Sequence, residues 1–278
     1  MNEEPRFAKD YSQRQVEAAH RVLVDVGHIL ASFQDAIVII GGWVPGLLLP
    51  DHSPKHVGSV DLDLALDAEK LADGRYAELL QQLLNTKRYH LGDKPFQMVA
   101  QVDLGDGDDL VRVEVEFLAS KEFRLKGKNL IDGFRVFQFD ECNVAFAEPR
   151  DISVEGLSLL GAQNTVNWQV VALPDFLVLK AHALKKRDKP KDAYDICYCL
   201  EHHPGGLQAL AQELRIRLAA ENASTVSQAI EFLREKFASA NHFGPHQYAE
   251  FHNEDDPDER AVHRQRAYAL VAGLLAAI

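Results

Sequence analysis

Two aspartates stand two residues apart in a segment that alternates between polar and apolar residues. Residues 60–67 read Val-Asp-Leu-Asp-Leu-Ala-Leu-Asp, so a strand here places Asp61 and Asp63 on one face, about 6.5–7 Å apart along the chain. Carboxylates that close repel each other unless a cation compensates them, and oxygen ligands favour Mg²⁺ or Mn²⁺ over zinc. Asp61 and Asp63 are therefore candidate metal ligands, although an Asp-x-Asp taken alone is more often a solvated strand face.

A third carboxylate is needed if two metal ions, about 3.5–4 Å apart, are to activate a hydroxyl and stabilise a leaving group. Residues 97–104 and 110–118 flank a Gly- and Asp-rich turn and predict a hairpin. The second of these strands carries Glu114 and Glu116 on one face. Either residue would serve if this strand pairs beside the aspartate strand, and we favour Glu116.

Two glycines precede the aspartate strand. Residues 36–40 read Ala-Ile-Val-Ile-Ile and end at Gly41 and Gly42, which is typical of a buried strand followed by a tight turn. Glycines there let backbone N–H groups approach a phosphate, and the N-terminus of a following short helix adds positive potential. Ser59 adds a hydroxyl just before the aspartates. A Gly-Gly after a strand is usually only a turn, but this combination in this order is more specific than either half.

A lysine on an apolar helical stripe forms a second block. Lys180 shares a face with apolar residues of its segment, which indicates either a charge directed into a cleft or a lysine whose stem covers the rim of the core. Residues 187–195 then read Arg-Asp-Lys-Pro-Lys-Asp-Ala-Tyr-Asp, and Pro190 suits a first helical turn. Asp192 and Asp195 fall on one face of that helix, as they also would in an ordinary salt-bridged helix start.

These two blocks together resemble a known family. The order strand, Gly-Gly, short helix, loop and Asp-x-Asp resembles the signature of the polymerase-beta-like nucleotidyltransferases, carried here by residues 40–43 and 59–64. A lysine helix followed by Arg-x-Lys-x-Lys-Asp-x-Tyr-Asp resembles the AbiEii-type branch of abortive-infection and toxin nucleotidyltransferases. The likeness covers residues 36–67 and 174–200.

The resemblance implies a role for each residue singled out above. The metal ion, Mg²⁺ or Mn²⁺, is expected to be held by carboxylates: Asp61, Asp63 and Glu116 (or Glu114). The triphosphate is expected to lie on small residues: Gly41, Gly42 and Ser59. Its charge is expected to be neutralised by a lysine that an aspartate orients: Lys180, with Asp192. Lys191 is expected to bind the nucleotide as well, or to cap the helix together with Asp195.

The implied reaction is an in-line attack by an acceptor hydroxyl on the α-phosphate of an NTP, with loss of pyrophosphate. The acceptor is tRNA or another RNA, a protein side chain, or a small molecule such as an aminoglycoside. The toxin-type resemblance favours RNA or protein and implies a cognate antitoxin, whereas the net charge of -12 argues mildly against RNA. The alternative from another class is a non-catalytic nucleotide-binding protein with the same fold.

The order of the predicted strands and helices around these residues predicts an α+β fold. A mixed sheet with flanking helices forms the nucleotidyltransferase core over residues 1–170, and a helical bundle follows over residues 171–278. Periodicity predicts helices over eight ranges: 11–33, 43–49, 68–84, 174–187, 190–201, 206–219, 224–238 and 257–277. We expect short strands and loops over residues 119–172. The polar composition of residues 241–256 predicts a surface loop.

Bulk composition is that of a globular protein. Three cysteines without framework spacing predict reduced thiols in a cytoplasmic protein. Residues 1–5 do not resemble a secretion signal, and no run reaches the roughly 20 apolar residues that span a membrane. His52 and His56 lie in the loop before the aspartates, where we expect them to be solvated or to touch substrate.

Overall fold

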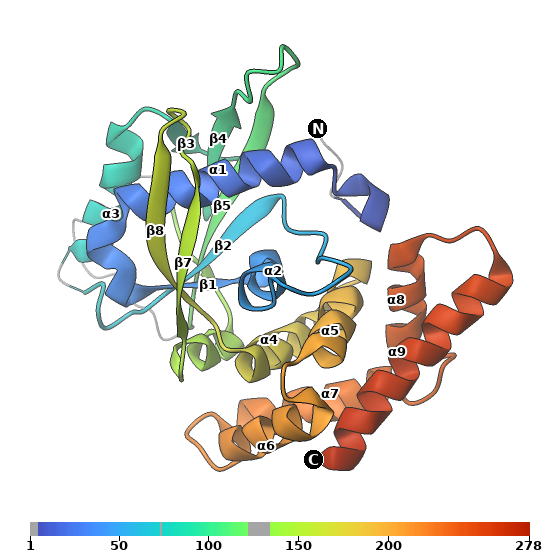
Figure 1. The fold of residues 1–278 in the computed structure, drawn as a ribbon. Coiled ribbons are helices and arrows are strands. Elements are labelled where there is room, and N and C mark those ends of the chain that lie inside the picture. Colours follow the sequence, from blue (N-terminus) through green and yellow to red (C-terminus); the bar gives the residue numbers. More distant parts are fainter. Residues whose placement is uncertain (1–4, 73, 122–133) are drawn as a thin grey trace. The chain divides into compact units, whose positions relative to one another are not determined.

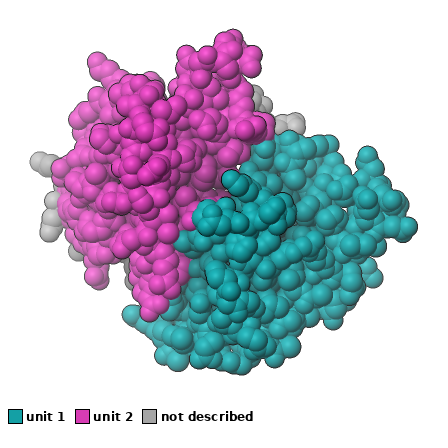
Figure 2. All heavy atoms as spheres, viewed as in Figure 1, with its two compact units in different colours: residues 1–11, 48–57, 173–278 teal, residues 12–47, 58–172 magenta. Residues whose placement is uncertain are grey.

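The computed structural model describes residues 5–72, 74–121 and 134–278. The chain forms two compact units, each built from more than one segment (Figure 2). The sheet unit, magenta in Figure 2, comprises residues 12–47 and 58–172. The helical unit, shown in teal, comprises residues 1–11, 48–57 and 173–278. Strands are confined to the first unit and long helices dominate the second, so the predicted α+β class is confirmed.

The sheet unit is organised around a mixed eight-stranded sheet in the order β3-β4-β5-β2-β1-β8-β7, with β6 paired to β5 (Figure 1). β2 is antiparallel to β1 and parallel to β5, and β1 is parallel to β8. The strands are β1 (Ile37–Ile40), β2 (Asp61–Leu66), β3 (Tyr89–Leu91), β4 (Gln97–Val102), β5 (Val111–Ala119), β6 (Phe137–Gln138), β7 (Arg150–Leu157) and β8 (Gln163–Val170).

Hydrophobic patterning explains the centre of this sheet. All four residues of β1 are buried, whereas β5 alternates between buried apolar residues and half-exposed residues that are mostly charged. Helix α1 (Gln13–Ile29) begins at a capping box made by Ser12 and Gln15 and packs against β5, β7 and β8 (Figure 1). The predicted hairpin is present as the antiparallel pair β4 and β5.

Five further helical segments occur in the described part of the sheet unit or at its boundary: η2 (Ala31–Ala36), η3 (Gly41–Trp43), α2 (Val44–Leu48), α3 (Arg75–Asn85) and η4 (Asp140–Phe146). The helix predicted over residues 68–84 begins only at Arg75. Gly74 precedes it with φ of 95°, a left-handed conformation that an α-helix does not continue through.

The described residues of the helical unit form six α-helices: α4 (Leu173–Lys186), α5 (Pro190–His202), α6 (Gly206–Leu218), α7 (Ala223–Lys236), α8 (Phe243–His252) and α9 (Pro257–Ala277). A short 3-10 turn, η1 (Ala8–Asp10), belongs to the same unit. Pro190 occupies the first turn of α5, as predicted. Within the described residues, no helix has the length and apolar content to cross a membrane.

Helix α8 corrects the prediction of a surface loop over residues 241–256. Its apolar residues are few and are interrupted by polar ones, so the sequence carries little helical periodicity. Tyr248, Ala249 and Phe251 are nevertheless buried, because α8 packs against α5 and α9. The rings of Phe251 and Tyr194 stack with centroids 4.4 Å apart. Tertiary packing therefore makes this segment helical where local pattern does not.

Candidate active site

The aspartate pair lies at the start of β2, beside β5. The register of these parallel strands places Asp61 beside Glu114 and Asp63 beside Glu116. Paired positions on neighbouring strands point to the same face of a sheet. The strand pairing that a third carboxylate requires is therefore present, and four acidic side chains share one face.

Gly41 makes room for the carboxylate of Asp63. The antiparallel register of β1 and β2 pairs Ile40 with Asp63, so the chain passes this carboxylate as it leaves β1. A Cβ atom built on Gly41 would lie 1.8 Å from Asp63 Oδ2, and the φ of Gly41 is +77°. Both the close approach and the left-handed backbone require glycine.

Hydrogen bonds from Ser59 and Trp43 hold Asp61 in place. Ser59, only 2% exposed, donates its hydroxyl to Asp61 Oδ1 at 2.6 Å. The indole N–H of Trp43 donates to the backbone carbonyl of Asp61 at 2.8 Å. Asp61, Asp63, Ser59 and the Gly41 turn thus form one local cluster, and Gly42 is buried in the next position of that turn.

Replacing Gly41 with alanine should disrupt this cluster. The added methyl group collides with Asp63, and the positive φ adds strain of about 1 kcal/mol or more. We expect lower stability in urea denaturation and loss of nucleotide transfer. Gly46→Ala is the matched control, because a Cβ there meets nothing within 4 Å. Equal urea midpoints for the two variants would contradict the packing of Gly41 on Asp63.

The candidate third carboxylates already have partners in the structure. Glu116 accepts from Gln97 Nε2 at 3.0 Å and from Lys94 Nζ at 3.1 Å. Glu114 accepts from the same Gln97 amide and, at 3.1 Å, from Arg112. The sequence patterns do not identify Gln97 as a site residue. The predicted hairpin, which places Gln97 opposite Glu116, could have indicated it.

The carboxylates of this face do not converge as a complete metal centre. In the part of the chain that the structure describes, no group of three or more His, Cys, Asp and Glu side chains is arranged to hold a metal ion. The Asp61 and Asp63 pair still fits magnesium by its chemistry, since Mg²⁺ is commonly held by one or two carboxylates together with substrate phosphates. A role for Glu116 (or Glu114) stays a prediction.

Lys180 lies in a buried ion cluster within the helical unit. Its Nζ atom is 2.9 Å from Asp192 Oδ1 and 2.7 Å from Asp195 Oδ2, and both aspartate side chains are fully buried. Arg187 Nε contacts the other oxygen of Asp192 at 2.7 Å. The Lys180 side chain is only 8% exposed, which excludes a lysine that merely extends its ammonium into solvent at the rim of the core.

The charges of this cluster stabilise one another. Burial lowers the pKa of Lys180, but the facing carboxylates outweigh that effect and raise the pKa above its ordinary value. Burial likewise opposes ionisation of Asp192, whereas Lys180 and Arg187 bring its pKa down to about 2. The carboxylates and the lysine are therefore ionised near neutral pH, so the cluster is a set of ion pairs.

The other carboxylate oxygen of Asp195, Oδ1, contacts two further residues. Lys191 Nζ lies 2.8 Å from Asp195 Oδ1 and His56 Nε2 lies 2.9 Å from the same oxygen. His56 is buried and stacks on Tyr194, so the expectation of a solvated or substrate-facing histidine is wrong. Burial, together with the nearby Lys191 charge, lowers the pKa of His56 to about 4. The neutral ring therefore donates Nε2–H to Asp195.

The lowered pKa of His56 predicts that stability falls in mild acid. Between pH 6.5 and pH 4 the unfolded chain binds a proton at His56 and the folded chain does not, so the free energy of unfolding decreases as pH drops. The loss from pH 7 to pH 5 should be on the order of 2 kcal/mol. Urea denaturation across this range measures it. His56→Gln keeps an N–H donor and should make the slope shallower without abolishing it, because burial also lowers the pKa of His252 to about 4; an unchanged slope would contradict the prediction.

The predicted site residues thus fall into two sets, one in each unit. The sheet unit brings together Gly41, Gly42, Ser59, Asp61 and Asp63, with Glu114 and Glu116 on the neighbouring strand. The helical unit brings together Lys180, Lys191, Asp192 and Asp195, to which the structure adds His56 and Arg187.

Comparison with known proteins identifies the family. Curated proteins give no match to this chain. Among solved structures, it is similar to an antigenic nucleotidyltransferase-like protein from Paracoccidioides brasiliensis, with 16% sequence identity and a TM-score of 0.38 over 75% of this chain and 92% of that one. The family described as nucleotidyl transferase AbiEii toxin, Type IV TA system, matches residues 52–271. Because that match covers well over half of the 278 residues, the chain belongs to the AbiEii nucleotidyltransferase toxin family.

Proposed function

We propose that this nucleotidyltransferase is metal-dependent and moves an NMP from an NTP onto a hydroxyl of an RNA or protein acceptor. The observation that carries the proposal is the cluster of Asp61, Asp63 and Ser59 on one strand, packed against the Gly41 turn. A carboxylate pair with an adjoining turn that has no Cβ is the arrangement that a metal-bound triphosphate needs.

Asp61 and Asp63 would hold the metal ion. Mg²⁺ bound there supplies positive charge that offsets the charge developing on the phosphate oxygens. Ser59 holds Asp61 in a fixed orientation by its 2.6 Å hydrogen bond. This reduces the conformational entropy that Asp61 would lose on binding the metal ion. The acceptor oxygen would form a bond to the α-phosphorus as the bond to pyrophosphate breaks, and the proton of the acceptor hydroxyl would pass to solvent water.

The ion cluster around Lys180 would supply further positive charge. Lys180, Lys191 and Arg187 contact Asp192 and Asp195, and the facing carboxylates raise the pKa of Lys180, so its positive charge is kept at neutral pH. We propose that Lys180 neutralises charge on the triphosphate and that Asp192 orients Lys180. Membership of a toxin family supports a cognate antitoxin as a partner of the chain.

The experiment that tests the function offers each α-³²P-labelled NTP with Mg²⁺ or Mn²⁺ to the protein in the presence of total cellular RNA and protein. We expect label to enter one pool, and Asp61→Ala/Asp63→Ala to abolish it. Label in neither pool would contradict the RNA or protein acceptor. Saturable Mg-NTP binding would then favour a small-molecule acceptor, such as an aminoglycoside.

A non-catalytic nucleotide-binding protein is the second candidate. The observation that favours it is the engagement of Glu114 and Glu116 by Gln97, Lys94 and Arg112, which leaves the third carboxylate unassembled. This alternative predicts nucleotide binding without turnover of labelled NTP to pyrophosphate in the presence of any acceptor pool, including small molecules.

A further inference from the structure

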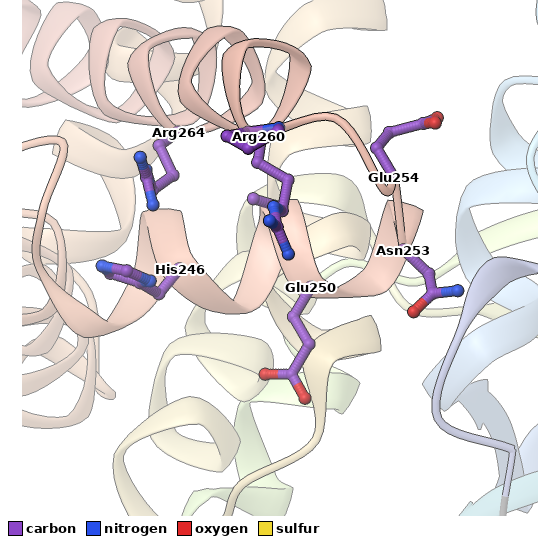
Figure 3. Close-up of a pocket in the computed structure, with 8 residues that line it drawn as sticks. His246, Glu250, Asn253, Glu254, Arg260 and Arg264 are labelled. Carbon is purple, nitrogen blue, oxygen red and sulfur yellow. The ribbon is translucent and has the colours of Figure 1, made fainter.

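A cavity of about 410 Å³ lies between α8 and α9 in the helical unit (Figure 3). Its charged lining residues come from both helices and the turn between them: His246, Glu250, Glu254, Arg260 and Arg264. The size falls within the range of small-ligand sites. None of these residues takes part in the proposed transfer reaction.

Two arginines of this cavity lack the ion pairs that other arginines of the unit make. Arg260 and Arg264 are one turn apart on α9, and Figure 3 shows both side chains extending toward α8, with His246 opposite Arg264. Among the described residues, no carboxylate lies within ion-pair distance of either guanidinium. Arginines elsewhere in the unit are paired, as in Arg6 with Glu250, Arg217 with Asp175 and Arg266 with Glu201.

The acidic residues of the lining do not neutralise the arginines. Glu250 points away from them in Figure 3, and its carboxylate binds Arg6 at 2.7 Å and Gln247 at 3.2 Å. Glu254 also points away from Arg260 and Arg264. Arg260 and Arg264 thus face the cavity with no carboxylate within ion-pair distance among the described residues, although Glu250 and Glu254 belong to the same lining.

The helix pair that carries these groups is well ordered by its own packing. On α8 and α9, the rings of His252 and His263 stack at 4.1 Å with an interplanar angle of 11°, and Tyr248 packs against both rings. Ala267, farther along α9, is fully buried. The backbone positions of Arg260 and Arg264 relative to α8 are therefore fixed before any ligand arrives, which reduces the entropy cost of binding.

We propose that this cavity is a binding site for a phosphate monoester, formed by Arg260, Arg264 and His246. A guanidinium binds phosphate oxygens through two parallel N–H donors, and a terminal phosphate carries a charge of about -1.5 to -2 near neutral pH, which matches two unpaired arginines. A phosphodiester carries one charge and would leave one guanidinium uncompensated. The ligand is a phosphorylated small molecule or the phosphorylated end of a nucleic acid.

Calorimetric titration of the full-length protein tests the proposal without depending on catalysis. The probes are inorganic phosphate and one oligoribonucleotide prepared with either a 5′-phosphate or a 5′-hydroxyl, all in EDTA. We expect saturable binding of phosphate, and stronger binding of the oligonucleotide when it carries the 5′-phosphate. Arg260→Gln/Arg264→Gln should weaken phosphate binding by about tenfold or more.

Two control variants separate this site from the proposed active site. Arg234→Gln removes an exposed arginine of α7 that pairs with Glu231, and it should leave phosphate binding unchanged. Asp61→Asn/Asp63→Asn should retain phosphate binding even if nucleotide transfer is lost. Two results would overturn the proposal: no saturable phosphate binding at millimolar concentration, or equal affinity for phosphate after removal of Arg260 and Arg264. Saturable phosphate binding with equal affinity for the phosphorylated and hydroxyl-ended oligonucleotides would assign the site to a phosphorylated small molecule.

Discussion

Asp63→Asn should lower the rate of nucleotide transfer by about a thousandfold, equivalent to about 4 kcal/mol of transition-state stabilisation. Asparagine has the size of aspartate and fits the space that Gly41 leaves, so the fold is retained while one negative charge is lost. A metal ion held by two carboxylates then keeps only one of them. Initial rates of label incorporation, with either Mg²⁺ or Mn²⁺, measure the effect.

Asp108→Asn is the matched control for this substitution. Asp108 lies in the turn between β4 and β5, its side chain is 75% exposed, and Arg14 is 3.7 Å away. The same change of charge there should leave the transfer rate unaltered. A full transfer rate in Asp63→Asn, with the urea midpoint of the unsubstituted protein, would show that the β2 carboxylates do not hold a catalytic metal ion.

Lys180→Met should destabilise the protein by about 3–5 kcal/mol. Methionine fills the volume of the lysine stem but removes the cation that lies between Asp192 and Asp195, so each buried carboxylate keeps only one cation, Arg187 or Lys191. Removing one partner of a buried ion pair costs far more than the pair itself contributes, because the remaining charge cannot be hydrated. The free energy of unfolding, measured in urea at pH 7, is the readout.

Lys185, on the same helix as Lys180, provides the comparison for this loss of stability. Lys185 of α4 pairs with Glu235 at 2.7 Å, but the two side chains are 37% and 54% exposed. Lys185→Met should therefore cost only about 0–1 kcal/mol. Similar losses for Lys180→Met and Lys185→Met would mean that water reaches the Lys180 cluster, and that its role is not structural.

Local patterns predicted most of the elements that carry the candidate site. Alternation over β2 and β5 placed two acidic residues on one face of each strand, and the run before Gly41 gave β1. The packing of Gly41 on Asp63 follows from strands that are neighbours in the sequence. The two aspartates and the glycine turn were within reach of sequence analysis because each depends on a short segment.

Contacts between distant segments were not predictable in the same way. His56 and Asp195 are separated by 139 positions, and nothing near either residue indicates the other. Gln97 lies in a strand that was predicted, but its bonds to Glu114 and Glu116 depend on rotamers that no pattern specifies. Helix α8 was missed because its burial comes from α5 and α9, and not from its own periodicity. The division into domains at residue 170 stays a prediction.

The discontinuous units have a consequence for synthesis on the ribosome. The helical unit takes residues 48–57 from the first quarter of the chain, and their partner helix α5 emerges only after the strands of the sheet unit. Before α5 is synthesised, Tyr194 and Tyr198 are not available to pack against the ring of His56. Residues 48–57 therefore lack their packing partners until that point. A protein expressed as two halves cut at residue 172 would separate His56 from Asp195. Translation through α5 is thus a condition for assembling either the ion cluster or the loop that it anchors.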